Sequence, residues 1–482
     1  MRALLIYYLT RHFLYSDNDA YLIYGTYTAL VYLTPVIGGI LADRYLGSRK
    51  VVVLGGLMLV AGHFGMAFEG DDAVAAAQGD THRDPVLLAA FYLSLSLIAV
   101  GAGFLKTNIS ALVGKLYAPD DPRRDSGFTY AYMGANIGSA LAPLPCGWLG
   151  ETYGWRYGFG LAGVGMLVGL VVFLRGQKYL GGHGEPPEPV RLRHRPAAGL
   201  TLETWLYLGA IPIVIAAWSA LMHPQVVGMA LALIGLLSAA YVLWFAFRRC
   251  GPTERDHLLV CGVLILFTIG FWAFYEQTGS SLALFAGRVV DRSIGAGEIP
   301  ASTLQALPPL FVIAGAPLFG LLWTALSRRG RDPSTPVKFV FGLSALALAF
   351  FVLAAGAWLV PSGQKVPLIW LILNFLLLVV GEMCLGPVGM AMVTRLSPPR
   401  IVGLMMGLFY LAYAASSYLA GQLAQLTSLA TVGGAAASLN QVTQHYAQVY
   451  SLFGLAAAMV ALILLALSPH LTRQISDRQW RL

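Results

Sequence analysis

Runs of about 20 apolar residues with almost no charge recur along the whole sequence. Examples are Tyr24–Ala42, Val51–Phe68, Tyr157–Leu174, Val226–Phe247 and Val449–Leu467. A helix of that length crosses the hydrocarbon of a bilayer and satisfies its backbone hydrogen bonds within itself. A buried soluble core does not require such a series. The pattern therefore predicts an all-α polytopic membrane protein.

The charge content supports this class. The chain is 57% hydrophobic and 11% charged, whereas soluble domains carry about 25% charged residues. Its formal net charge of +8 is explained by the basic cytoplasmic loops that membrane proteins carry, so nucleic acid is not an expected partner. No cysteine pair has metal-ligand or redox spacing. We expect no metal and no cofactor.

Fourteen helical segments are predicted. They are 2–14, 20–43, 49–68, 86–116, 126–150, 156–175, 203–222, 226–248, 256–287, 303–327, 336–359, 367–395, 400–424 and 445–468. The first is too short to span hydrocarbon. Basic loops then fall mostly on the side that holds both termini, and the opposite side carries the acidic patches Asp17–Asp19 and Glu69–Asp72. This asymmetry predicts cytoplasmic N- and C-termini.

A linker rich in proline, glycine and charge runs from Gly176 to Pro196 and separates six predicted helices from eight. We expect an N-terminal six-helix bundle in 1–175, the linker with two extra transmembrane helices in 176–250, and a C-terminal six-helix bundle in 251–482. Two six-helix halves joined by a cytoplasmic linker are the plan of the major facilitator fold.

One lysine interrupts the apolar run that begins at Phe91. Lys106 lies in VGAGFLKTNIS, and Glu276 and Glu382 lie inside apolar runs of the second half. A charged side chain within a spanning helix indicates a functional site. A lysine satisfied by helix carbonyls and packing is the structural alternative. Opposite charges on the two halves suit a central cavity, in which a carboxylate can carry a proton.

The loop GGILADRYLGSRKVV, Gly38–Val52, is the second candidate site. Asp43 and Arg44 end one helix, Gly47 turns the chain, and Arg49 and Lys50 begin the next. An ordinary basic cytoplasmic loop would also have this composition. The pattern resembles the signature loop of major facilitator transporters, which implies that Asp43 and Arg44 belong to the cytoplasmic gate.

Four longer stretches resemble the proton-coupled oligopeptide transporter family, in the bacterial type that has two extra helices. They are GAGFLKTNISALVG, the fifth and sixth helices in Phe128–Met166, FWAFYEQTGSSLALFA, and the tenth and eleventh helices in Gly381–Gly421. The resemblance covers nearly all of the chain. It implies a symporter in the bacterial inner membrane that imports di- and tripeptides by alternating access, driven by the proton gradient.

The resemblance also implies roles for single residues. Glu276 matches the family's proton-linked glutamate and Arg2 the arginine that pairs with it. Lys106 matches the lysine that attracts the peptide carboxylate. Glu382 and Asn136 match residues that receive the peptide amino terminus. The pocket-lining aromatic positions are Tyr32, Trp272 and Phe409, although aromatic residues at such positions also pack against lipid or core.

The sequence departs from the family at three places. The first-helix motif Glu-x-x-Glu-Arg-Phe-x-Tyr-Tyr would end just before Met1, so we expect a truncated first helix. Either the start codon is misassigned, the chain is shortened, or the protein lacks the roles of that motif, and we favour the first two. Pro308 stands where an asparagine is common. Gly386 and Phe409 replace a serine and a tryptophan.

These departures keep two alternatives open. One is a transporter of the same fold for a peptide-like drug, a modified peptide or another anion. The other is a non-transporting membrane receptor. An enzyme is not expected, because no metalloprotease motif, nucleophile elbow or phosphate-binding loop is present.

Overall fold

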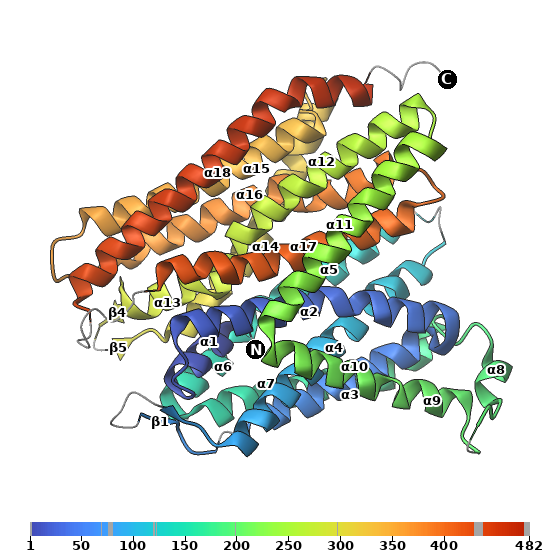
Figure 1. The fold of residues 1–482 in the computed structure, drawn as a ribbon, viewed down its shortest axis with the longest axis horizontal. Helices are drawn as coiled ribbons and strands as arrows, with labels where there is room; N and C mark the ends of the chain where they lie inside the picture. The colour runs from blue at the N-terminus through green and yellow to red at the C-terminus, as the bar shows by residue number, and fades with distance from the viewer. Residues whose placement is uncertain are drawn as a thin grey trace. The chain divides into compact units, whose positions relative to one another are not determined.

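The computed structural model describes residues 2–68, 70–75, 81–118, 121, 123–197, 199–295, 297–428 and 437–476, and these are almost entirely helical. They cluster into two compact units, Met1–Val227 and Gly228–Leu482 (Figure 1). Eleven helical stretches among the described residues are long and apolar enough to cross a membrane. The prediction of a polytopic helical protein is therefore confirmed.

The first unit contains the helices that hold the signature loop and Lys106. They are α1 (Arg2–Arg11), α2 (Asp17–Leu41), a π-helical turn η1 (Ala42–Leu46), α3 (Gly47–Met66), α4 (Pro85–Lys115), α5 (Arg124–Leu141), α6 (Pro143–Tyr153), α7 (Trp155–Gly176), the 3₁₀ turn η2 (Gln177–Leu180), α8 (Pro189–Arg193), α9 (Leu202–Leu208) and α10 (Ala210–Met222). The short strands β1 (Val74–Ala75) and β2 (Thr81–His82) pair antiparallel.

The second unit contains the helices that hold the two intramembrane carboxylates. After α11 (Pro224–Arg249), in which the units meet, they are α12 (Pro252–Tyr275), η3 (Glu276–Gly279), α13 (Ser281–Arg288), η4 (Ala301–Ala306), α14 (Leu307–Arg328), α15 (Thr335–Leu359), α16 (Leu368–Leu396), α17 (Val402–Ala424), η5 (Gln425–Thr427) and α18 (Leu439–Ser476). Strand β3 (Val290–Asp291) pairs parallel with β6 (Val366–Pro367), and β4 (Ser293–Ile294) pairs antiparallel with β5 (Gly297–Glu298).

Helix α4 is held against α2 and α3 by backbone approach at glycines. A Cβ added to Gly55 of α3 would lie 2.7 Å from the Gly101 carbonyl of α4, and one added to Gly103 would lie 2.8 Å from the Pro35 backbone nitrogen of α2. Small residues allow this contact between spanning helices, where lipid provides no hydrophobic drive for association. The Thr34 hydroxyl adds a bond to the Ala99 carbonyl at 3.0 Å. These contacts fix the helix that carries Lys106.

The second unit packs around aromatic and aliphatic side chains. Helix α15 lies beside both α16 and α18, and α12 packs against α16, α17 and α18 (Figure 1). Phe285, Phe350 and Phe375 are among the largest side chains that are fully buried there. This core places α12, which Glu276 follows directly, beside α16, which carries Glu382.

Three predicted helices are interrupted. The predicted helix 203–222 is divided at Gly209, between α9 and α10. The predicted helix 126–150 is divided at Ala142, because Pro143 and Pro145 lack backbone donors. The predicted helix 256–287 is divided after Tyr275 by the 3₁₀ turn η3 and by Ser280, whose φ of −121° and ψ of −97° are not helical. Gln277 stabilises this last break, since its Nε2 donates to the Ala273 and Ala420 carbonyls at 3.1 and 3.0 Å.

The loop at Gly47 turns as predicted. Gly47 has φ +75°, a conformation that is costly for residues with a Cβ. A Cβ there would also lie 2.5 Å from the Gly184 carbonyl oxygen. The linker thus runs directly against the loop, and the Arg49 backbone N–H donates to the same Gly184 carbonyl at 3.0 Å.

The predicted division into 1–175, 176–250 and 251–482 stays a prediction. The boundary between the compact units falls at Val227 and Gly228, inside the middle segment. Helix α10 packs against α2 and α4 of the first unit, whereas a Cβ at Gly228 of α11 would meet the Tyr418 ring of the second unit. His223 separates α10 from α11.

Replacing Gly55 with alanine is expected to destabilise the first unit. The added methyl group would press on the backbone of α4, with Gly101 and Leu105 atoms at 2.7 and 2.9 Å, and overpacking costs about 1–3 kcal/mol. Thermal unfolding in detergent measures the change. Gly39→Ala on α2 is the matched control, because a Cβ there meets nothing within 4 Å and alanine favours the helix. Equal melting temperatures for both variants would contradict the packing argument.

Candidate functional site

The side chains predicted to form the site fall into two groups, one in each compact unit. Lys106, Arg2, Tyr32 and Asn136 belong to the first unit, and Glu276, Glu382, Trp272 and Phe409 belong to the second.

Lys106 lies well inside α4. It precedes the last helical residue, Lys115, by nine positions, which is about 14 Å along the axis. Its side chain is exposed, and its Nζ lies 5.0 Å from the centroid of the Tyr32 ring on α2. A ring face attracts a cation more strongly where water is scarce. The Tyr32 ring of α2 thus contacts the exposed ammonium group of α4.

Arg2 lies in the first turn of α1 and contacts α2. Its Nε donates to the Tyr24 hydroxyl at 3.0 Å, and its guanidinium lies 5.8 Å from the centre of the same ring. Tyr24 is buried, whereas Arg2 is exposed. The arrangement fixes the stem of the arginine and leaves an exposed cationic side chain in the same unit as Lys106.

Asn136 lies on α5 and is half-buried. Its Nδ2 donates to the Tyr132 carbonyl one turn earlier, at 2.9 Å. The amide is therefore oriented by its own helix, and its oxygen is available as an acceptor.

Glu382 of α16 is bound to α12 by a phenol. The Tyr275 hydroxyl donates to its Oε2 at 2.5 Å, and a charge-assisted bond of this kind is strong and specific in geometry. An ionised carboxylate has two oxygens that together accept about four hydrogen bonds. Tyr275 therefore fixes the carboxylate and leaves acceptor capacity for a cation.

Aromatic rings surround this bond. The Trp272 ring lies 4.9 Å from the Tyr275 ring and 4.8 Å from the Tyr413 ring, and Tyr413 lies 5.2 Å from Phe409. Trp272 is 7% exposed, and its Nε1 has no hydrogen-bond acceptor among the residues that the structure describes. We call Trp272, Tyr275, Phe409 and Tyr413 the aromatic group of α12 and α17.

Glu276 begins the break in α12. It is 3% exposed and is the first residue of η3. Non-helical backbone within a membrane is tolerated where protein buries it or where it lines a cavity. Around Glu276 the Gln277 amide donates to the Ala273 carbonyl, and the Ser281 hydroxyl holds that amide by donating to its Oε1 at 2.7 Å.

The departures Gly386 and Pro308 both lie in the second unit. A Cβ at Gly386 would meet the Glu382 Cγ at 3.7 Å and the Trp272 Cζ2 at 4.0 Å, which is ordinary contact. A small side chain would fit there, so glycine leaves room beside the carboxylate. Pro308 is buried in the first turn of α14 and has no polar side-chain atom.

The predicted gate residues lie on the turn η1. Asp43 and Arg44 are both exposed. The loop after them is tied to its surroundings, since Lys50 Nζ pairs with the Glu203 carboxylate of α9 at 2.5 Å and Lys115 Nζ donates to the Ser48 hydroxyl at 3.1 Å. Their gating role stays a prediction.

Three contacting tyrosines were not among the predicted residues: Tyr24, Tyr275 and Tyr413. The helical spacing of Trp272 with Tyr275 (i, i+3) and of Phe409 with Tyr413 (i, i+4) puts each pair on one face. That spacing was a usable signal for Tyr275 and Tyr413. Tyr24 had none, because its contact with Arg2 joins two separate helices, α1 and α2, and helical spacing does not report such a contact.

Comparison with known proteins identifies the family. The family model described as POT family matches residues 49–442. The uncharacterized transporter YclF of Bacillus subtilis is 36% identical over 435 residues, which cover 88% of this chain and 84% of the relative. The peptide transporter YePEPT of Yersinia enterocolitica is 36% identical, with 84% and 78% covered. Dipeptide and tripeptide permease A of Cronobacter turicensis is 32% identical, with 99% and 90% covered.

Solved structures of the same kind superpose on the chain. A mutant of peptide transporter POT in complex with alafosfalin has a TM-score of 0.81 at 31% identity, with 98% of this chain and 92% of that chain covered. Peptide transporter POT in complex with sulfate has a TM-score of 0.80 at 32% identity, with 98% and 91% covered.

The fold and these relatives define a multi-pass membrane transporter of the major facilitator fold, not an enzyme. The chain belongs to the POT family, whose members include peptide transporters. The resemblance read from the sequence is thereby confirmed.

Proposed function

We propose that this chain imports di- and tripeptides together with protons by alternating access. The observation that carries this proposal is the distribution of charged side chains between the helices of the two units. The first unit supplies the cations Lys106 and Arg2, and the second supplies the carboxylates Glu276 and Glu382. Intramembrane charges mark substrate and proton sites, and relatives with peptide-transport names support the substrate class.

A short peptide has the complementary charges. It is a zwitterion whose ends lie about 6–7 Å apart in an extended dipeptide. Its carboxylate suits Lys106, and its ammonium suits Glu382 with Asn136. A ligand that binds one residue of each unit would link the two units, and the transport cycle of this fold requires such closure.

The aromatic group of α12 and α17 suits recognition of the peptide backbone. The Trp272 Nε1 is a buried donor that a substrate carbonyl would satisfy, and an unmet buried donor is costly. Tyr275 orients Glu382 for the ammonium. Phe409 and Tyr32 provide apolar surface that accepts varied side chains. Selection would then rest on the two ends and the backbone of the peptide.

Proton coupling is assigned to Glu276 with Arg2 as its partner. A buried carboxylate remains charged when it is paired with a cation, and protonation cancels the attraction. Binding of a proton would thus break the link between the arginine and the carboxylate, and release of the proton would form it again. The break in the helix at Glu276 supports this assignment.

We further assign the chain to the bacterial inner membrane with both termini cytoplasmic. The lipid bilayer and protons are then its other partners. The support is the excess of basic residues in the loops on the side of Arg49 and Lys50.

A modified or peptide-like solute is the second candidate. Gly386 leaves room beside Glu382, and Pro308 provides no side-chain donor. These positions favour a substrate whose amino-terminal region is larger than that of an ordinary dipeptide.

Glu276→Gln is expected to abolish proton-driven accumulation and to leave counterflow exchange, because glutamine cannot exchange a proton. Uptake of a labelled dipeptide into proteoliposomes, with and without a pH gradient, measures both activities. Glu254→Gln, at an exposed ion pair with Arg400, is the control. Retained accumulation by Glu276→Gln would overturn the coupling role.

Lys106→Ala is expected to weaken binding of free dipeptides by about thirtyfold and of C-terminally amidated dipeptides far less. A hydrogen bond to a charged group contributes about 2 kcal/mol, which corresponds to that factor. Competition binding to the purified protein provides the comparison, with Lys178→Ala as the control at an exposed lysine. Equal weakening for both ligands would exclude the carboxylate role.

Tyr275→Phe is expected to weaken the binding of free dipeptides about tenfold relative to the binding of N-acetylated dipeptides. The change removes one hydrogen-bond donor to Glu382 and leaves the ring packing. A loss of about 1.4 kcal/mol of binding free energy corresponds to a tenfold change in affinity. The same competition assay applies. Tyr418→Phe, whose hydroxyl accepts from Gln422 at 3.2 Å, is the control. An unchanged ratio between the two ligands would show that Tyr275 has no positioning role.

A further inference from the structure

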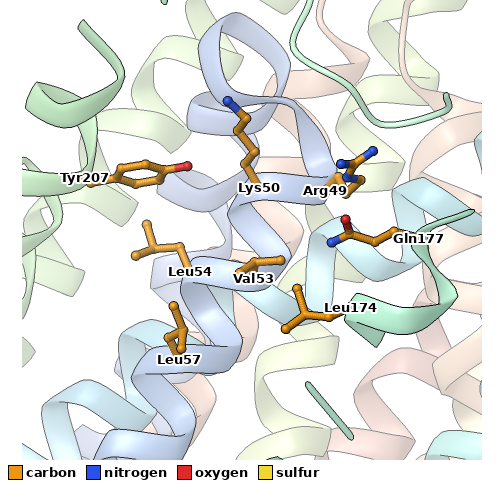
Figure 2. Close-up of a pocket in the computed structure, with 8 residues that line it drawn as sticks. All are labelled: Arg49, Lys50, Val53, Leu54, Leu57, Leu174, Gln177 and Tyr207. Carbon is orange, nitrogen blue, oxygen red and sulfur yellow. The ribbon is translucent and has the colours of Figure 1, made fainter. Parts of the chain in front are cut away.

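A cavity of about 410 Å³ lies in the first unit, between the start of α3, the end of α7 and α9. Its polar end is lined by Arg49 and Lys50 of α3, Gln177 of η2 and Tyr207 of α9. Figure 2 shows Tyr207 approaching from one side and Gln177 from the other, with the side chains of α3 between them. The volume suits a small ligand or a lipid headgroup.

The two cations keep unused donors. Lys50 pairs with Glu203 at 2.5 Å, and Arg49 pairs with Glu185. An ammonium has three donors and a guanidinium five, so each pair leaves capacity for a further anion. Both cationic side chains are about one-third exposed. Tyr207 donates to Glu203 at 3.0 Å, which holds that carboxylate on the α9 side.

The other end of the cavity is aliphatic. Val53, Leu54 and Leu57 of α3 line it together with Leu174 of α7. Lys50, Leu54 and Leu57 share one face of α3, so the lining changes from charged to apolar over about 10 Å. Leu57 is 53% and Leu174 45% exposed, and both belong to membrane-spanning helices. The apolar end therefore opens toward hydrocarbon.

We propose that this cavity binds one anionic glycerophospholipid. Its phosphate lies against Arg49, Lys50 and Gln177, and one acyl chain follows Leu54, Leu57 and Leu174. The gradient from cations to leucines matches that molecule and does not suit inorganic phosphate, which would leave the leucines uncovered. The site is separate from the residues assigned to peptide and proton.

Photo-crosslinking tests the proposal directly. The full-length protein is reconstituted in phosphatidylcholine vesicles that contain phosphatidylglycerol with a diazirine on one acyl chain. Peptide mapping is expected to place the adducts within residues 53–57 and at Leu174. Adducts spread evenly over other lipid-facing helices, such as α11, would overturn the proposal.

Charge variants separate lipid binding from the ion pairs. Arg49→Gln with Lys50→Gln is expected to lower the photo-adduct yield at least fivefold, since each basic side chain near a headgroup contributes about that factor. Glu203→Gln also breaks the Lys50 pair but removes a competing anion, so its yield is expected to rise or stay equal. Loss of adduct in Glu203→Gln would show that the ion pair merely shapes the cavity.

Two further controls keep the outcome interpretable. Leu57→Trp fills the apolar end without changing charge and is expected to reduce the adduct as well. Added inorganic phosphate is expected to leave the yield unchanged, and full competition by it would identify a free-anion site instead. Thermal unfolding of each variant confirms folding, and peptide counterflow reports on the peptide site independently.

Discussion

A chain that crosses hydrocarbon must satisfy nearly every backbone hydrogen bond within its own helices. This constraint explains where the protein departs from regular helix. The interruption at Glu276–Ser280 has a local compensation in Gln277, which bonds both to its own helix and to the Ala420 carbonyl of α17. A broken helix within the bilayer is thus retained together with a buried glutamate. The hydrogen bonds of Gln277 and the carboxylate of Glu276 therefore lie at the same break in the second unit.

The charged side chains have different contacts in the two units. In the first, Lys106 and Arg2 are exposed, and each lies against a tyrosine ring. In the second, Glu382 accepts from the Tyr275 phenol and Glu276 is buried. The first unit thus presents cations beside tyrosine rings, and the second presents the Glu382 carboxylate beside a phenol.

Much of the fold could be predicted from the sequence, because spanning helices need long apolar runs and because Gly47 marked a turn that only glycine adopts easily. Lys106, Glu276 and Glu382 could be found for a related reason, since an ionisable residue within an apolar run is costly. The division of α12 was missed, because Thr278 and Gly279 are common within spanning helices and the stabilising bond to Ala420 is distant in the sequence. Tyr275 was missed because a tyrosine beside a predicted glutamate is typical of a packing residue. Its hydrogen-bond partner, Glu382, lies on another helix, α16. The pairing of Arg2 with Glu276 and the gate role of Asp43 stay predictions.

The contact between Gly47 and Gly184 changes how the linker after α7 should be regarded. Its Glu185 and Gly184 are fastened to the start of α3, and Glu203 is fastened to Lys50. The segment is therefore fixed along the first unit and is not a flexible connection. An insertion of flexible residues before Gly184 would detach the signature loop from its support, whereas the same insertion at His223 would lengthen the chain without touching that loop.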